Sequence, residues 1–365
     1  MKIKLYKSFT KELMETRKKI DQSNRLTVFQ HLDWQKNWFK YIGEKQNYKL
    51  NIIIVEDAKK NKILLPFCIK TKLGIKILTF IGGNQTDYFS AIYSEKLNIN
   101  NNIWNKIEGY LDYYDLIEIP NLINFQFNKF FLPMKNPIVN ISEISNYAIL
   151  ESTWEKQKLK LRKKLIKDTS RQIKRLKAIG HLEFNIINFK DANYEKFLKI
   201  FFEQKENRYK KTGAFNNFYY SEIKNFYKNT ADLAGSNTSI QFSTLKLNNQ
   251  IIATHWGAYD NRTFYYLMPT FSYKWERYSP GTILLEFLIR WCIDEKKEVF
   301  DFTIGSENYK KEWCDNQLEL NEFISPKSYK GYIYSVFKKF KKDLKKIPIF
   351  ITIIQIFRKF KAKRF

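Results

Sequence analysis

The sequence predicts a mixed α/β (α+β) fold in two domains, and three observations lead to this prediction. The chain of 365 residues is longer than one ordinary domain. Short apolar runs alternate with amphipathic stretches along most of it, which is typical of sheets covered by helices. Residues 263–304 read as strand, helix, strand with a small-residue turn before the helix, which predicts a βαβ unit.

The composition fits a folded protein without metal or disulfide bonds. Hydrophobic residues make up 44% and aromatic residues 17%, while glycine and proline are scarce. Three cysteines and three histidines lack the paired spacing of a disulfide framework or a zinc site, so we expect no metal. The net charge of +27 fits either a polyanionic partner or a lysine-rich composition without a binding role.

The first predicted domain covers residues 1–150. Its expected strands are 50–55, 63–69, 75–80 and 116–119, and a turn at 57–61 joins the first two. Its expected helices lie around Trp38 and over 102–110. Asp87 and Tyr88 follow the pair Gly82-Gly83 and are candidates to line an acceptor groove.

Residues 151–181 are predicted to be a basic helical connector. Lysines and arginines dominate the stretch 152–180, and Gly180 is a natural helix end. Leu159, Ile166 and Ile173 recur every seven residues, so one face can pack while the others stay in water. We expect one long helix that joins the two domains, either fully solvated on its basic faces or attracting an acidic glycan or lipid diphosphate.

The second predicted domain covers residues 182–325. Its expected elements are a strand at 182–187, a helix at 193–211, strands at 240–247 and 250–259, and the βαβ unit with a strand at 263–268, a helix at 283–293 and a strand at 299–304.

The turn that opens the βαβ helix is a predicted phosphate-binding site. It contains Arg277, Tyr278, Ser279, Gly281 and Thr282. Ser279 suits the N-cap, proline at 280 suits the first helical position, and glycine lets a phosphate approach the backbone. The alternative is that the turn merely starts a core helix.

Residues 326–365 are predicted to be a basic amphipathic tail. Ile333, Val336, Phe337, Phe340 and Leu344 fall at helical spacing among many lysines. Such a helix suits an anionic membrane surface, and the alternative is a packed helix with its lysines in water. The longest apolar run, 347–357, is too short to span a bilayer, and no signal peptide is visible. We therefore expect a cytoplasmic protein at the inner face of the membrane.

With these elements in order, the chain resembles the CelD/BcsL-type acetyltransferases of exopolysaccharide and cellulose biosynthesis, distant relatives of Fem-type aminoacyltransferases. The second domain resembles the GNAT acyltransferase fold. The matching pieces are Phe29-Gln30, Trp34, Trp38, Thr86-Asp87-Tyr88, Arg171, Arg175, 252–257, 278–281, 300–302, 305–307, Tyr309-Lys310 and Trp313. The turn departs from the usual GNAT pattern because it has a single glycine.

The resemblance implies two tandem GNAT-like domains, the first degenerate, and direct transfer of an acyl group from acetyl-CoA or another acyl-CoA to an amine or hydroxyl of a sugar or glycan precursor. His255 lies in a predicted strand, and its neutral imidazole suits a general base. The resemblance suggests that Tyr309 protonates the leaving thiolate.

Three further polar residues complete the predicted site. Asp301 and Glu307 are candidates to orient His255, to hold a sugar hydroxyl, or to pair with a neighbouring cation. Lys310 is a candidate to contact a coenzyme phosphate, or is a solvated surface lysine.

Two other interpretations stay open. One is a Fem-type transferase that uses aminoacyl-tRNA and a lipid-linked acceptor, although the sequence lacks an obvious two-helix arm. The other is a non-catalytic protein that binds glycan or membrane. Specific nucleic-acid binding is not expected, because no recognised binding motif accompanies the basic runs.

Overall fold

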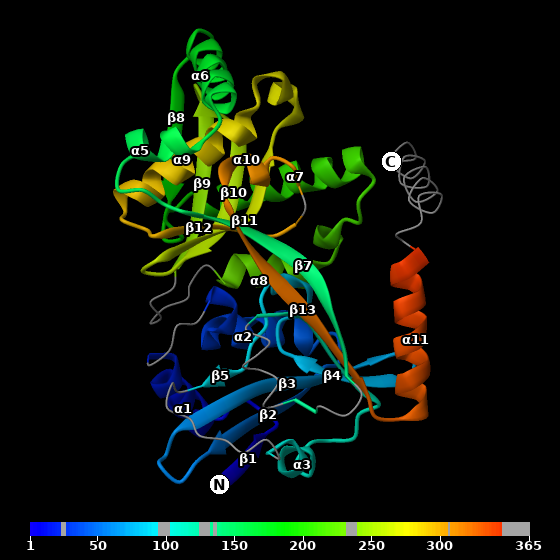
Figure 1. Ribbon diagram of the computed structural model, residues 1–365. Helices are drawn as coiled ribbons and strands as arrows, with labels where there is room; N and C mark the ends of the chain where they lie inside the picture. Colours follow the sequence, from blue (N-terminus) through cyan, green and yellow to red (C-terminus); the bar gives the residue numbers. More distant parts are fainter. Residues whose placement is uncertain are drawn as a thin grey trace. The chain divides into compact units, whose positions relative to one another are not determined.

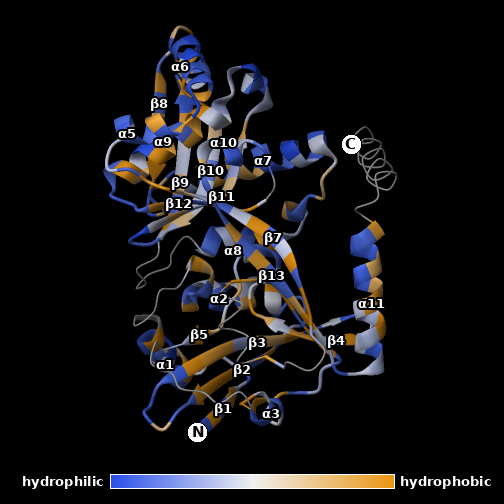
Figure 2. Ribbon diagram, in the orientation of Figure 1, coloured by the Kyte–Doolittle hydropathy of each residue, from blue (hydrophilic) through white to orange (hydrophobic). Residues whose placement is uncertain are grey.

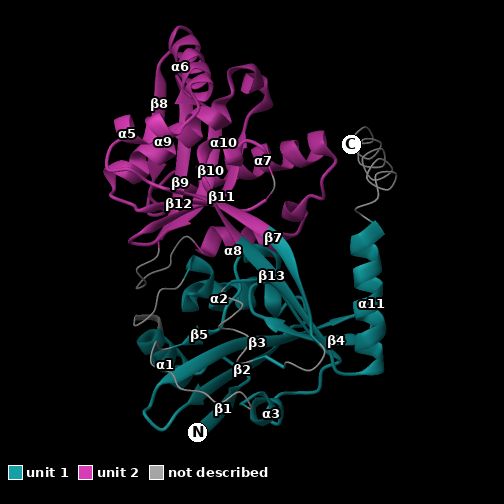
Figure 3. Cartoon of the chain, in the orientation of Figure 1, with its two compact units in different colours: residues 1–143, 319–354 teal, residues 144–318, 355–365 magenta. Residues whose placement is uncertain are grey.

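A computed structural model describes residues 1–22, 27–93, 103–123, 132–133, 137–230, 239–305 and 307–344 (Figure 1). The described residues form two compact units (Figure 3). Unit 1 contains residues 1–143 and the segment that begins at residue 319, and unit 2 contains residues 144–318. Ser306 and the apolar run 347–357 of the tail, both part of the sequence predictions, lie outside the described residues.

Unit 1 is built on a mixed sheet with the strand order β1-β2-β3-β4-β6-β13. The pair β4 and β6 is parallel, and the other neighbours are antiparallel. The strands are β1 (Lys2–Tyr6), β2 (Lys49–Glu56), β3 (Lys62–Lys72), β4 (Ile75–Phe80), β5 (Ile92–Tyr93), which pairs with β3, β6 (Leu116–Leu122) and β13 (Asn316–Pro326). The helices are α1 (Lys11–Gln22), α2 (Leu32–Trp38), α3 (Ile103–Glu108) and α11 (Tyr329–Leu344).

The hairpin of β2 and β3 shows how local chemistry sets this sheet. The Asp57 carboxylate accepts hydrogen bonds from the backbone N–H groups of Lys59 and Asn61, which closes the predicted turn. The apolar residues on both sides of the turn then pair in register, with Val55 opposite Ile63. Both side chains are fully buried in the core of unit 1.

Unit 2 is built on a second mixed stretch of sheet with the strand order β7-β12-β11-β10-β9-β8. Only β11 and β12 are parallel in this stretch. The strands are β7 (Ile138–Ile149), which enters the unit at residue 144, β8 (Leu182–Ile187), β9 (Ser239–Leu247), β10 (Gln250–Tyr259), β11 (Thr263–Phe271) and β12 (Val299–Ile304). The helices are α5 (Trp154–Lys160), α6 (Lys163–Lys177), α7 (Tyr194–Thr212), α8 (Ser221–Thr230), α9 (Pro280–Asp294) and α10 (Lys310–Trp313).

The apolar helix α9 forms the centre of the core of unit 2. Its residues Leu284 and Leu288 are fully buried and pack with Phe300 and Phe302 of β12. Proline occupies its first position, and Ser279 at the N-cap adopts a left-handed conformation with φ of 50°. The predicted βαβ unit is therefore confirmed. Its helix begins at Pro280, the first helical position predicted from the turn, and not at residue 283, where the predicted apolar run begins.

The predicted basic connector differs from the structure in two respects. The expected single helix over 152–180 is wrong, because α5 and α6 are separated by Leu161 in an extended conformation. Leu161 and Leu176 belong to the core of unit 2, so both helices are part of that unit. Ile166 and Ile173 pack as expected, whereas Leu159 is exposed.

The mixed α/β fold class is confirmed by the architecture of both units. Strands β4, β8, β10 and β12 have the predicted bounds. Strands β7 and β13 were not predicted, and β13 returns the chain to unit 1, so that α11 packs there.

Candidate functional site

An opening between β11 and β12 provides the setting of the candidate site in unit 2. The two parallel strands pair through three residue pairs only, from Thr263 with Val299 to Tyr265 with Asp301. Strand β11 then continues to Phe271 while pairing with β10. Beyond Tyr265 and Asp301, no further residue pairs of β11 with β12 occur among the described residues.

A cluster of polar side chains gathers around this opening. Tyr266 extends from β11, Glu307 and Tyr309 follow β12, and Lys205 and Arg208 come from α7. Burial, the nearby Tyr309 and the Glu307 carboxylate raise the pKa of Tyr266, while Arg208 opposes this effect. Since these groups affect one another's titration, they form one electrostatic unit.

Lys205 is the most unusual member of the cluster. Only 7% of it is exposed, although lysine is almost never buried without a partner. Burial and the neighbouring Arg208 lower the pKa of Lys205 to about 7, against the favourable influence of Glu307. A large share of Lys205 is therefore a neutral amine near pH 7, which is the form that accepts a proton.

Tyr309 has the opposite character. Burial and the adjacent Glu307 raise the pKa of its hydroxyl, so Tyr309 stays protonated at neutral pH. For Glu307, partial burial raises the carboxyl pKa, but Lys310 and Arg208 outweigh it and hold that pKa below its usual value. The cluster thus contains a neutral amine, a protonated phenol and a carboxylate.

Lys310 is held rigidly beside Glu307. Its Nζ donates to the Ile304 carbonyl at 2.6 Å and lies 3.1 Å from Oε2 of Glu307, and its side chain is almost fully buried. Gly305 makes this arrangement possible, because a Cβ there would lie 2.3 Å from Glu307 Oε2 and 2.6 Å from Lys310 Nζ. Its φ of +130° also favours glycine.

His255 lies deep within the sheet of unit 2. Its imidazole is 0% exposed, stacks on the ring of Tyr266 at 4.5 Å and packs over Gly257, where a Cβ would lie 2.3 Å from its Cε1. Within the described part of the chain, neither ring nitrogen has a hydrogen-bond partner. Burial and the nearby Lys205 hold the pKa of His255 well below its ordinary value, so the ring is neutral.

Asp301 does not accompany His255. Its carboxylate accepts hydrogen bonds from the Thr303 backbone N–H at 2.7 Å and from the Ser145 hydroxyl at 3.2 Å. It alternates along β12 with Phe300 and Phe302, whose rings contact Tyr266, the residue that stacks on His255. Since neighbouring strand residues point to opposite faces, Asp301 and His255 lie on opposite faces of the sheet.

The turn before α9 presents fewer backbone donors than its sequence predicts. Proline at 280 has no N–H, and the N–H groups of Thr282 and Ile283 both donate to the Ser279 carbonyl. The Ser279 hydroxyl makes no capping hydrogen bond. Among residues 279–283, all of which are described, Gly281 alone retains an N–H without a protein acceptor.

Two arginines supply positive charge at this turn. The guanidinium groups of Arg175, from α6, and Arg277 lie over the ring of Tyr278 at 5.0 and 4.8 Å from its centroid. Arg277 also donates to the Tyr278 hydroxyl at 2.8 Å. Neither arginine has a carboxylate partner within the described ranges, so their like charges are available to an anion.

The remaining predicted residues lie in unit 1. Tyr88 is buried, contacts the ring of Phe29 at 5.4 Å, and its carbonyl accepts a hydrogen bond from Gln30. Asp87 beside it is partly buried. Tyr88 is thus a packing residue of unit 1, and the structure does not assign these two residues to the cluster of unit 2.

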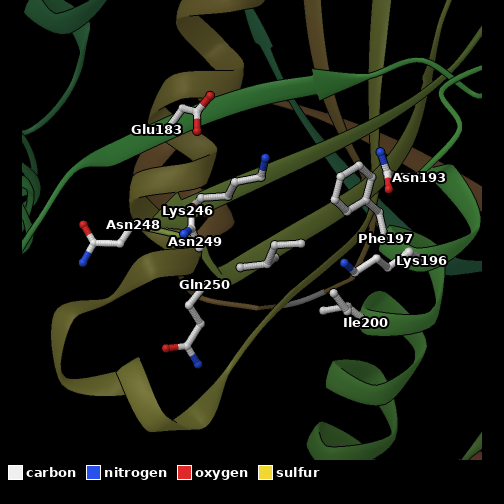
Figure 4. Close-up of a pocket in the computed structure, with 10 residues that line it drawn as sticks. Glu183, Asn193, Lys196, Phe197, Ile200, Lys246, Asn248, Asn249 and Gln250 are labelled. Atoms are coloured by element: carbon white, nitrogen blue, oxygen red, sulfur yellow. The ribbon is translucent and has the colours of Figure 1, made fainter.

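A pocket of about 540 Å³ lies elsewhere in unit 2, between α7 and the hairpin of β9 and β10 (Figure 4). It is lined by polar and basic side chains around Phe197, among them Lys196, Lys246 and Glu183. None of the predicted site residues lines it. Lys205 and its cluster do not line it either, so this pocket is separate from the Lys205 cluster.

From β8 onward, unit 2 follows the order strand, two helices, three strands, the helix α9, strand and short helix. Residues 163–311 match the model of the acetyltransferase (GNAT) domain. This match confirms the GNAT part of the resemblance and supports an acyltransferase, while the narrower CelD/BcsL assignment stays a prediction. A search of curated proteins found no match.

Three solved structures are similar to nearly the whole chain. FemX aligns with a TM-score of 0.64 and 10% identity, over 92% of this chain and 99% of FemX. A conserved protein of unknown function from Bacteroides thetaiotaomicron aligns with a TM-score of 0.55 and 11% identity, over 89% and 100%. The C-terminal DUF2156 domain of a putative lysylphosphatidylglycerol synthetase from Agrobacterium fabrum aligns with a TM-score of 0.54 and 10% identity, over 88% and 94%. At such identities the likeness shows the fold.

Sequence reasoning missed Lys205 and Arg208. The sequence predicts a helix face of Phe197, Ile200, Phe201 and Gln204. Phe201 and Gln204 are buried as expected, but the observed face also buries Leu198 and Lys205. Lys205 does continue the helical spacing of Leu198 and Phe201, at intervals of three and four residues. A lysine at such a position usually extends its amine into water, so the spacing alone did not indicate a buried amine. No group of three metal-ligating side chains occurs in the described ranges.

Proposed function

We propose that this protein is a GNAT-type acyltransferase that moves an acetyl or other acyl group directly from acyl-CoA to an amine or hydroxyl of a sugar precursor of surface polysaccharide. The cluster of Lys205, Glu307 and Tyr309 at the opening between β11 and β12 is the observation that carries the proposal. It combines a proton acceptor on the buried Lys205 with a proton donor on the partly buried Tyr309, as acyl transfer requires.

The proposed reaction has two proton transfers. The acceptor nitrogen or oxygen attacks the thioester carbonyl carbon and gives its proton to neutral Lys205. When the tetrahedral intermediate collapses, the carbon–sulfur bond breaks and the Tyr309 hydroxyl gives its proton to the departing thiolate. The cation of Lys205 then loses its proton to solvent, and Tyr309 regains one, so the enzyme returns to its initial state.

The donor's phosphates are proposed to lie at the turn before α9. Arg175 and Arg277 provide the charge, and the Gly281 N–H provides one backbone donor. Tyr278 belongs to this site through the two guanidinium groups that it holds, while Ser279 and Thr282 shape the turn. Lys310 is proposed to fix Glu307, whose carboxylate would face the acceptor.

His255 and Lys205 are rival proton acceptors, and the structure favours Lys205. A fully buried imidazole with a strongly lowered pKa is a weak base, whereas an amine with a pKa of about 7 is well matched to neutral pH. We propose that His255 instead sets the environment of Lys205 through the sheet.

A thiol-release assay with acetyl-CoA and a panel of amino-sugar nucleotides tests the function and the base together. Lys205→Met is expected to lower kcat by at least about a hundredfold with little change in the donor KM. His255→Asn is expected to lower kcat less than Lys205→Met does. Equal activity of Lys205→Met and the unaltered protein would remove Lys205 from the mechanism, and absence of thiol release with every acceptor would refute acyl-CoA chemistry.

A second candidate is a Fem-type transferase with an aminoacyl-tRNA donor and a lipid-linked acceptor. The alignment with FemX over 92% of this chain favours it. The turn before α9 also favours it, because a single free backbone N–H offers few hydrogen bonds to the diphosphate of a coenzyme. Transfer of a radiolabelled amino acid from charged tRNA that ribonuclease abolishes would establish this candidate. Transfer from acyl-CoA that survives ribonuclease would exclude it.

A further inference from the structure

Helix α11 packs on unit 1 mainly through small and charged residues, with Tyr334 as an aromatic contact to a small apolar cluster. Gly331 and Ser335 are buried, and a Cβ at Gly331 would lie 2.1 Å from the carbonyl oxygen of Asp115. Lys338 forms ion pairs with Glu118 of β6, at 3.0 Å, and with Glu322 of β13. The protein-facing side of this helix is therefore largely polar.

The opposite side of α11 is apolar and in water. Its large hydrophobic residues are between 50% and 79% exposed: Tyr329, Tyr332, Ile333, Val336, Phe337 and Phe340. A surface helix normally buries its apolar stripe and exposes its polar one. The arrangement in α11 is inverted, which is typical of a face that is covered by another molecule.

The exposed side has an orderly distribution of residues. At 100° per residue, the six apolar positions span an arc of about 140°. Lys339 lies at one edge of this arc and Lys330 and Lys341 lie at the other, all of them exposed. Figure 2 shows hydrophobic and hydrophilic residues side by side along α11.

Charge decides which partner suits this face. A second copy of the chain would place the same lysines against each other, which costs free energy. A surface of anionic lipid offers acyl chains to the apolar arc and negative headgroups to the flanking lysines. No helix of the described ranges is long and apolar enough to cross a bilayer, so contact would be interfacial.

We infer that α11 is a membrane-docking helix, whose residues 329–340 insert among anionic lipids while Lys330, Lys339 and Lys341 contact the headgroups. The polar packing of the inner face keeps α11 attached to unit 1 when its outer face enters the lipid. Docking would bring the protein to any acceptor that is itself carried on lipid, but it does not depend on the proposed acyl transfer.

Co-sedimentation of the full chain with vesicles tests this inference. Vesicles of phosphatidylcholine with phosphatidylglycerol are expected to bind the protein, and vesicles of phosphatidylcholine alone are expected to bind it at least about tenfold more weakly. The variant Phe337→Ser/Phe340→Ser should lose at least about tenfold in partitioning. Lys339→Glu/Lys341→Glu should lose binding to the anionic vesicles, and added salt should weaken binding by the unaltered protein.

A matched control is Leu159→Ser/Tyr219→Ser, which removes two exposed apolar residues from unit 2 and should leave binding unchanged. Thermal unfolding should be the same for all variants, because the altered side chains are exposed. Undiminished sedimentation of the Phe337/Phe340 variant would overturn the inference. So would a dimer in solution that the same variant dissociates, since the face would then bind a second copy.

Discussion

At the scale of single residues, Lys205 is expected to make the free energy of unfolding depend on pH. Its folded-state pKa of about 7 lies below its ordinary value of 10.5. Between these two values the folded protein binds fewer protons than the unfolded chain, so the free energy of unfolding rises with pH across that window. Lysine at this position therefore destabilises the fold most strongly below pH 7.

Replacing Lys205 with methionine should remove this pH dependence. We expect Lys205→Met to raise the urea midpoint at pH 6, by an amount worth a few kcal/mol at most, and to change it little at pH 10. Chemical denaturation of both proteins at the two pH values measures the effect. A gain that is equal at both pH values would show that Lys205 titrates as an ordinary surface lysine.

The two arginines at the turn before α9 permit a second test at the same scale. Arg175→Gln/Arg277→Gln should raise the donor KM by about tenfold to a hundredfold with a smaller change in kcat, because charge-assisted contacts to phosphate are lost. Arg171→Gln is the control, since Arg171 lies on the same helix as Arg175 but is paired with Asp168 at 3.0 Å. An equal rise in KM for the control would indicate a nonspecific effect of net charge.

At the scale of the element, the link between β12 and α10 depends on Gly305. Gly305→Ala should destabilise the protein by about 1–3 kcal/mol and reduce activity, because it strains the backbone and displaces Glu307 and Lys310. Gly74→Ala is a matched control, because Gly74 also has a positive φ of 74° but a Cβ added there would meet nothing within 4 Å. Urea unfolding should show a larger loss at Gly305, and equal losses would mean that the close contact is unimportant.

Elements with strong local patterns were predictable, and those defined by distant partners were not. Strands β4, β8, β10 and β12 are apolar runs bounded by polar residues, so their bounds follow from composition. No residue in the first half of strand β7 is fully buried, and β13 begins with polar residues. Only their distant pairing partners define these strands, and a single sequence does not show such pairing.

Some residues of the candidate site were predictable from the sequence and others were not, for the same reason. The residues after β12 were found because they follow a recognisable strand, whereas Lys205 was missed because its burial is a tertiary effect. His255 and Asp301 were each correctly placed in a strand, but the sequence could not show that their side chains lie on opposite faces of the sheet.

At the scale of the whole molecule, unit 1 is built from two segments that are far apart in the sequence. Unit 1 requires the segment after residue 319, whose Phe323 is fully buried in its core. A chain that ends at residue 318 should therefore lose the folded state of unit 1, because it lacks β13 and α11. The described part of unit 2 is one continuous segment, 144–318, and should survive.

Limited proteolysis of this shortened chain provides the measurement. We expect a resistant fragment that covers roughly residues 144–318 and rapid digestion of residues 1–143. The full chain under the same conditions is the control and should protect both regions. Protection of residues 1–143 in the shortened chain would show that unit 1 folds without its last strand.

Because β13 joins β6 only after unit 2 has been synthesised in full, the ribosome imposes an order on this fold. The nascent chain exposes an incomplete first unit for as long as residues 144–318 are being translated. At elongation rates of about 5–20 residues per second, that interval lasts on the order of ten seconds or more. The edge of β6 stays unpaired during this interval, so this protein should depend on chaperones more than its size alone suggests.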